Sequence, residues 1–182
     1  SVALFAQNAS ADVTPTLTTT YANPNIGGSG NLTLDTSFAY NNTSVSTGEV
    51  IGRAVARDAR VRLLRHARNR GIVAASNAGI ASAQGDFITF VDHDDRIAPH
   101  ALLFVADAIV ANAQLDFLYS DEDRIDEQGR RHAPLFKSGW NPELLRAVNS
   151  VLHLMVVRAD RLRAVGGMRE GLDGVQDWDC AL

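Results

Sequence analysis

From residue 51 onward, short apolar runs alternate with longer amphipathic segments along the chain. Four of the apolar runs predict strands, because they are short and rich in branched and aromatic residues: 61–66, 86–91, 115–120 and 150–157. The run at 86–91 is continuous, which is typical of a parallel strand covered on both faces. Helical patterns lie between and after these runs, at 71–85, 99–113, 141–148 and 159–167. Strands that alternate with helices predict an α/β fold.

Local signals indicate where some of these elements begin and end. Pro99 and Pro142 suit the first turn of a helix, and Asn141 suits the N-cap position before the second of them. The pair Gly166–Gly167 is expected to end the helix before it. A close backbone approach to a bound molecule is the other interpretation of these two glycines.

Two further stretches have simple structural interpretations. Residues 121–139 are polar and are predicted to form a long loop. His153 lies within an apolar run, so we expect a core histidine with satisfied hydrogen bonds. Met155 and Cys180 are interpreted as packing residues.

Composition narrows the classes of function. The 182 residues carry a net charge of −4, which gives no basic footprint for a nucleic acid. Cys180 is the only cysteine, so an internal disulfide framework and a cysteine-based zinc site are excluded. No apolar run approaches the roughly 20 residues that a membrane-spanning helix needs.

The first 50 residues differ in composition from the rest. They hold 21 Ser, Thr or Asn residues against 11 in residues 51–182, and no Lys or Arg precedes Arg53. We therefore expect an atypical segment at 1–50 and a globular domain at 51–182. The atypical segment is predicted to be loop, β or disordered structure, and the tail of a secretory signal peptide is the other interpretation of its beginning.

Three carboxylates follow the buried run at 86–91: Asp92, Asp94 and Asp95. Like charges this close repel one another, so a cation is expected to compensate them. Ligands of open α/β sheets bind beyond the carboxyl ends of strands, where these residues are predicted to lie. Mg²⁺ or Mn²⁺ prefers a few carboxylates together with phosphate oxygens. The alternative is a set of solvated loop acids, one of which caps the following helix.

Four segments together resemble the donor-binding half of the family 2 glycosyltransferases, which have the GT-A fold. They are NRGIVAASNAGI (69–80), AQGDFITFVDHDD (83–95), YSDEDRIDEQGRRHAPLFKSGWNPELL (119–145) and VGGMREGLDGVQDWDCAL (165–182). The segments follow one another as in the family and at similar spacing, so the resemblance covers about residues 53–182. The third segment is most similar to the bacterial cell-surface polysaccharide branch, rhamnosyltransferase-like members included. The resemblance implies a nucleotide-diphospho-sugar transferase with a Rossmann-like α/β/α sandwich.

On the donor side, the resemblance implies a role for each matching residue. Asp92 and Asp94 match the aspartates that hold Mg²⁺ or Mn²⁺ on the nucleotide diphosphate, and Asp92 and Asp95 also match nucleotide-sugar-binding positions. The segment that lines the nucleotide is matched by Asn69, Arg70, Gly71 and Asn77. A plain turn is the alternative for Gly71, and a satisfied polar group between helix and sheet is the alternative for Asn77.

On the acceptor side, Asp177 in VQDWD matches the family's catalytic base, which deprotonates the acceptor hydroxyl. The alternative is an ordinary first-turn acid that the helix dipole favours. Acceptor contacts are implied, less directly, for residues of two kinds, acids after a strand and aromatic rings that can stack on a sugar: Asp121, Glu122, Asp123, Trp140 and Trp178. A solvated acidic surface and core tryptophans are the alternatives.

The resemblance therefore implies inverting transfer of a sugar from a nucleotide-diphosphate donor to a hydroxyl acceptor in cell-surface polysaccharide synthesis. The implied acceptor is a glycan or a lipid-linked glycan. A cytoplasmic location at the inner face of the bacterial membrane follows, with peripheral membrane association through regions outside this chain.

The resemblance weakens at both ends of the chain. The family's opening strand with its P-T-Y-N turn does not appear, nor does its second strand ending in D-D-G-S. In the nearest register, Asn41 and Asn42 stand where two acids are expected. We therefore expect that residues 1–50 do not build the usual donor-binding half, and that the chain stops before the usual C-terminal acceptor helices.

Two other functions remain open. One is a non-catalytic fragment or nucleotide-binding remnant that keeps the fold without turnover. The other is a phosphotransferase of the haloacid-dehalogenase type, which also places D-x-D after an apolar strand. That family has Thr or Val where this chain has Arg96.

Overall fold

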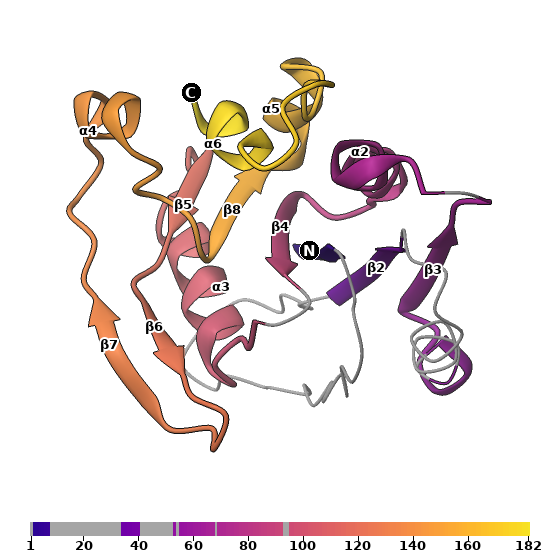
Figure 1. The fold of residues 1–182 in the computed structure, drawn as a ribbon, viewed down its shortest axis with the longest axis horizontal. Helices are drawn as coiled ribbons and strands as arrows, with labels where there is room; N and C mark the ends of the chain where they lie inside the picture. The colour runs from indigo at the N-terminus through magenta and orange to yellow at the C-terminus, as the bar shows by residue number, and fades with distance from the viewer. Residues whose placement is uncertain (1, 8–33, 41–52, 54, 68, 93–94) are drawn as a thin grey trace.

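The computed structural model describes residues 2–7, 34–40, 53, 55–67, 69–92 and 95–182. A central six-stranded sheet has the order β3-β2-β1-β4-β8-β5 (Figure 1). Its strands are β1 (Val2–Gln7), β2 (Leu34–Tyr40), β3 (Val61–Arg65), β4 (Phe87–Asp92), β5 (Phe117–Tyr119) and β8 (Met155–Arg158). A separate two-stranded hairpin is formed by β6 (Glu122–Ile125) and β7 (Arg131–Leu135). The helices are α2 (Gly71–Ser82), α3 (Ala101–Ala111), α4 (Pro142–Ala147), α5 (Ala159–Ala164) and α6 (Gln176–Ala181).

The direction of one strand determines which residues meet at the edge of the sheet. Strands β3, β2, β1 and β4 are parallel to one another, whereas β8 is antiparallel to both of its neighbours, β4 and β5. The beginning of β8 therefore lies at the same edge as the ends of β1, β4 and β5. In the register, Gln7 pairs with Asp92, and Tyr119 pairs with Met155. The expected α/β fold class is confirmed, with a mixed rather than an all-parallel sheet.

The core lies on both faces of β4 and β8, as the continuous apolar run predicts. Ile88 and Phe90 belong to a cluster with Leu162 of α5, whereas Phe87 belongs to a second cluster with Val105 of α3. Successive side chains of a strand point to opposite faces, so this division places α5 and α3 on opposite sides of the sheet. Both faces of β4 are thus dry, which fixes the strand and its terminal carboxylate.

Residues 1–50 contribute two parallel strands, β1 and β2, to the middle of the sheet. The expectation that this segment does not build that half is therefore wrong for these two strands. The short apolar run of β1, VALFAQ, was also consistent with the tail of a signal peptide, and polar residues interrupt the run of β2, LDTSFAY. Asn41 and Asn42 lie outside the described residues.

The predicted loop at 121–139 is instead the β6–β7 hairpin. Its strands are mostly exposed and polar, so they lack the apolar alternation that indicates a strand. Asp126 closes the turn: its side chain accepts hydrogen bonds from the backbone N–H of Gln128 at 3.0 Å and of Arg130 at 2.8 Å. The Arg130 N–H groups hold the pKa of Asp126 below its usual value.

The predicted helix ends are partly confirmed. Asn141 caps α4, because its Oδ1 accepts hydrogen bonds from the backbone N–H of Glu143 at 3.1 Å and of Leu144 at 3.0 Å. Helix α3 begins at Ala101, so Pro99 precedes it rather than forming its first turn. No described helix is long and apolar enough to cross a membrane.

The glycine pair ends α5, as expected, and Asn77 of α2 holds the turn that follows. Asn77 donates to Met168 O at 2.8 Å and accepts from Met168 N–H at 2.9 Å. Gly167 has φ +74°, and a Cβ built on it would lie 2.5 Å from Asn77 Oδ1. Only glycine therefore fits this position without moving Asn77.

Candidate active site

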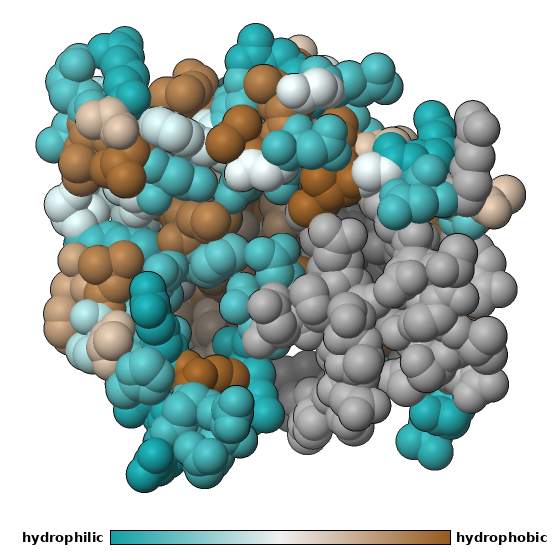
Figure 2. All heavy atoms as spheres, in the orientation of Figure 1, coloured by the Kyte–Doolittle hydropathy of each residue, from teal (hydrophilic) through white to brown (hydrophobic). Residues whose placement is uncertain are grey.

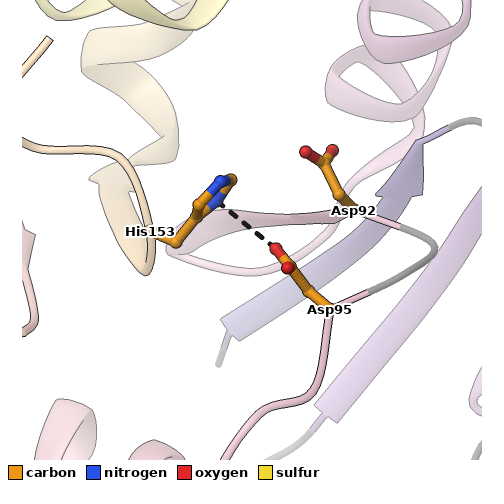
Figure 3. A group of neighbouring side chains, drawn as sticks. All are labelled: Asp92, Asp95 and His153. Atoms are coloured by element: carbon orange, nitrogen blue, oxygen red, sulfur yellow. Dashed lines mark ion pairs between the residues drawn. The ribbon is translucent and has the colours of Figure 1, made fainter. Parts of the chain in front are cut away.

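Two carboxylates and one imidazole meet at the ligand edge of the sheet. Asp92 is the last residue of β4, Asp95 follows shortly after, and His153 lies just before β8. One ligand atom from each of the three lies within 4.8 Å of the others (Figure 3). His153 Nδ1 lies 3.5 Å from Asp95 Oδ2, and the His153 side chain is 34% exposed. The prediction of a core histidine is therefore wrong.

The sheet topology explains why the sequence did not indicate this histidine. His153 precedes β8, and β8 is the reversed strand between β4 and β5. Its beginning consequently lies beside the end of β4, where Asp92 projects. A sequence pattern gives the position of a strand but not its direction, so the apolar run at 150–157 favoured a buried side chain.

The predicted base, Asp177, lies at a pocket that two residues of this cluster also line. Asp92 and His153 line this pocket together with Gln176 and Asp177, the first two residues of α6. Phe90, Leu152 and Met155 supply its apolar lining. The structure thus brings Asp177 to the same pocket as Asp92, although the two are 85 positions apart in the sequence.

Neighbouring side chains hold Asp177 and its helix in place. Asn149 Nδ2 donates a hydrogen bond to Asp177 Oδ2 at 3.2 Å. Trp178 packs against the core and donates from Nε1 to Leu145 O at 2.6 Å, which anchors α6. Burial raises the pKa of the Cys180 thiol to about 11, and the negative charge of Asp177 raises it as well.

The remaining acceptor candidates form contacts with cationic or aromatic groups. Asp121 accepts from Lys137 N–H at 2.8 Å, Glu122 pairs with Lys137 Nζ at 2.9 Å, and Asp123 pairs with Arg131 Nε at 2.5 Å. Two of these three acids are therefore paired with cations, and the third is bonded to a backbone N–H.

Trp140 is the most exposed aromatic candidate, at 57%, and it meets Phe117 edge to face with a centroid distance of 5.7 Å. Figure 2 shows hydrophobic surface on the side of the molecule where β7 and α4 lie in Figure 1. The exposed apolar residues of this part of the chain include Leu135, Phe136, Trp140, Leu144 and Val148.

The predicted nucleotide segment lies at the beginning of α2. Asn69 Oδ1 accepts from the Gly71 N–H at 2.9 Å, and Arg70 is the exposed N-cap residue. Gly71 has φ +83°, and a Cβ there would lie 3.0 Å from Asp173 Oδ1 in the stretch that precedes α6. The start of α2 thus lies beside the segment that leads to Asp177. Asp94 lies outside the described residues.

Comparison with known proteins identifies the family. Residues 38–159 match the family described as Glycosyl transferase family 2. The chain belongs to glycosyltransferase family 2. This family 2 chain is 43% identical over 140 residues to O-antigen biosynthesis protein RfbC of Myxococcus xanthus, a match that covers 77% of the chain and 11% of RfbC. It is 28% identical over 144 residues to chondroitin synthase of Pasteurella multocida, covering 75% of the chain and 14% of that protein. The chain therefore spans only a small part of the length of these relatives.

Solved structures share the fold of this family 2 chain. TarS residues 1–349 of S. aureus in complex with UDP-GlcNAc superimposes with a TM-score of 0.63 at 17% identity, covering 80% of the chain and 42% of TarS. A mannosyltransferase from Pyrobaculum calidifontis in complex with GDP-Man and Mn²⁺ superimposes with a TM-score of 0.57 at 16% identity, covering 81% of the chain and 41% of that enzyme. The expected family and GT-A fold are confirmed.

Proposed function

We propose that this chain carries the donor site and catalytic base of an inverting glycosyltransferase of cell-surface polysaccharide synthesis. The observation that carries the proposal is the pocket shared by Asp92, His153 and Asp177. Two residues of a candidate cation site and a candidate base line this one pocket, which supports the proposal. Inverting transfer requires this proximity, because the acceptor hydroxyl lies at the base while the diphosphate of the donor lies at the cation.

Asp177 acts as the general base in this proposal. Its carboxylate takes the proton from the acceptor hydroxyl while the hydroxyl oxygen attacks the anomeric carbon from the face opposite the leaving group. The bond between the anomeric carbon and the donor phosphate oxygen breaks, and its electron pair leaves on the nucleotide diphosphate. Asn149 occupies one oxygen of Asp177, which leaves the other oxygen to receive the proton.

The residues at the end of β4 fit a divalent cation. Two carboxylates and an imidazole, with ligand atoms within 4.8 Å of one another, form a donor set of hard oxygens and one nitrogen that suits Mn²⁺ or Mg²⁺. Asp92, Asp95 and His153 would hold the ion, together with Asp94 by its match to the family's D-x-D. Such an ion supplies Lewis-acid stabilisation of charge on a diphosphate.

The donor and acceptor are proposed from the segments around this pocket. Asn69, Arg70 and Gly71 at the start of α2 would line the nucleotide, with Asn77 supporting them through the turn at Met168. The structural neighbours are complexes with UDP, UDP-GlcNAc and GDP-Man, which favours a nucleotide-diphospho-sugar donor here as well.

Trp140 and the acids Asp121, Glu122 and Asp123 would border a glycan acceptor, free or lipid-linked. A cytoplasmic position at the inner membrane face agrees with such an acceptor. Trp178 serves instead to anchor α6, since its indole is committed to Leu145 and to the core.

Metal-dependent donor binding tests the cation site. We expect Mn²⁺ to strengthen the binding of UDP or GDP to the chain in titration calorimetry. Asp92→Asn, Asp94→Ala and His153→Ala should each remove most of that effect, whereas His132→Ala, which changes an exposed histidine of β7, should not. Equal nucleotide binding with and without metal would contradict the assignment.

Turnover distinguishes the enzyme from a non-catalytic remnant. A panel of nucleotide sugars is incubated with the chain, Mn²⁺ and cell-surface glycan acceptors, and release of nucleotide diphosphate is measured. Acceptor-dependent release supports the transferase. Tight nucleotide binding without any release across the panel would instead support the remnant.

A further inference from the structure

The only lysine of the chain is buried against the backbone that carries His153. The Lys137 side chain is 4% exposed, and its Nζ pairs with Glu122 Oε2 at 2.9 Å. The same Nζ donates hydrogen bonds to the backbone carbonyls of Leu152 and His153. One ammonium group therefore joins the β6–β7 hairpin to the backbone of the histidine that faces Asp95.

Lys137 belongs to a wider set of contacts that hold the chain from Leu152 to Met155. The Leu154 carbonyl accepts from the Ser120 N–H at 3.2 Å, and the Leu154 N–H donates to Ser120 Oγ at 3.2 Å. The Met155 carbonyl accepts from Thr89 Oγ1 at 2.7 Å. Four successive carbonyls thus have partners, and Lys137 supplies those for the two nearest the imidazole.

The charge and burial of Lys137 indicate a specific task rather than ordinary packing. A buried ammonium group is unfavourable unless it is paired and hydrogen-bonded, and here one carboxylate supplies the ion pair and two carbonyls accept hydrogen bonds. Leu152 and His153 precede β8, so regular strand pairing does not hold their backbone. Without other contacts, this backbone could adopt several orientations. The ammonium group fixes it through the two carbonyls.

We propose that Lys137, paired with Glu122, is a positioning residue that fixes the Leu152–His153 backbone so that the His153 imidazole faces Asp92 and Asp95. The proposal rests on the proposed cation site for its functional meaning. Groups that orient a metal ligand typically change metal affinity by about 10- to 100-fold when they are removed.

The decisive variant removes both charges together. Lys137→Met alone leaves two carbonyls and Glu122 without their partner and can lower stability. Lys137→Met/Glu122→Gln keeps a similar volume and leaves no buried lone charge, so stability should largely recover. The carbonyls of Leu152 and His153 stay without the ammonium group in both variants. Arg130→Met is the matched control, because it removes a cation from an exposed ion pair in the same hairpin.

Two measurements on the full chain test the proposal independently. Hydrogen exchange at the amides of residues 152–154 should become at least tenfold faster in the double variant and stay unchanged in Arg130→Met. Mn²⁺ affinity, measured with the metal alone, should fall by about 10- to 100-fold in the double variant. A double variant with unchanged exchange at 152–154 overturns the positioning role. If the unsubstituted chain binds no Mn²⁺, the cation part of the proposed function fails, while the exchange measurement still decides the role of Lys137.

Discussion

Asn149 and Asp177 are joined by a hydrogen bond of 3.2 Å, from Nδ2 of the amide to Oδ2 of the carboxylate. Asn149 follows α4 and Asp177 is the second residue of α6, so the bond fixes a short C-terminal helix to a distant part of the chain. Both residues are half-buried, and Asp177 lines the pocket that Asp92 also lines. The amide thereby selects one orientation of a carboxylate that would otherwise rotate.

Replacement of Asn149 tests this orientation. Asn149→Ala should lower kcat about tenfold and leave the KM for the donor nearly unchanged, because a hydrogen bond to a charged group contributes roughly 1.5 kcal/mol or more. Steady-state kinetics of acceptor-dependent nucleotide release provide the measurement. Asn112→Ala is the control, since the Asn112 side chain accepts the Gln114 N–H in an exposed turn away from the pocket. A change in donor KM without a change in kcat would contradict the positioning of the base.

Replacement of Asp177 tests the base itself. Asp177→Asn keeps the shape of the side chain and removes its charge, so turnover should fall by about 10²- to 10⁴-fold while donor affinity changes little. Asp179→Asn should have a milder effect, because Asp179 pairs with Arg169 rather than lining the pocket. Near-normal turnover of Asp177→Asn, or a loss explained entirely by weaker donor binding, would refute the assignment.

The sequence predicted the elements that have strong local patterns. It did not predict the strands whose position depends on pairing within the sheet. The run at 86–91, the cap at Asn141 and the end of α5 follow from local chemistry and agree with the structure. Strands β1 and β2 lie in a Ser/Thr/Asn-rich segment, and their place comes from pairing with β4 and β3 rather than from local propensity.

The sequence also predicted only part of the candidate site. Asp92 and Asp177 follow recognisable segments, so each was found from its motif. His153, Asn149 and Lys137 became visible only through tertiary contacts with residues 16 to 58 positions away. No periodicity indicates that a lysine at the end of a polar hairpin is buried, because its partners are backbone carbonyls of a distant segment.

The turn after α5 provides a test of stability. Gly167→Ala should lower the free energy of unfolding by about 3 kcal/mol, since it combines a positive φ with displacement of Asn77 and its hydrogen bonds to Met168. Gly166→Ala should cost only about 1 kcal/mol, because Gly166 has φ +89° but no atom within 4 Å of a built Cβ. Urea unfolding at equal m-values measures the difference. Equal midpoints for the two variants would show that Asn77 does not constrain Gly167.

The last prediction uses Cys180 as a reporter of the charge on Asp177. Burial raises the pKa of the thiol to about 11, and the negative charge of Asp177 adds to the effect. The thiolate is the reactive form, so iodoacetamide should modify Cys180 at pH 8 roughly a hundredfold more slowly than a free cysteine. Removal of the carboxylate charge stabilises the thiolate and lowers the pKa of Cys180, so Asp177→Asn should raise the modification rate several-fold. Asp179→Asn should leave the rate unchanged, because Asp179 is committed to Arg169. An unchanged rate in Asp177→Asn would mean that no ionised carboxylate lies beside the thiol, and a base must be ionised to accept a proton.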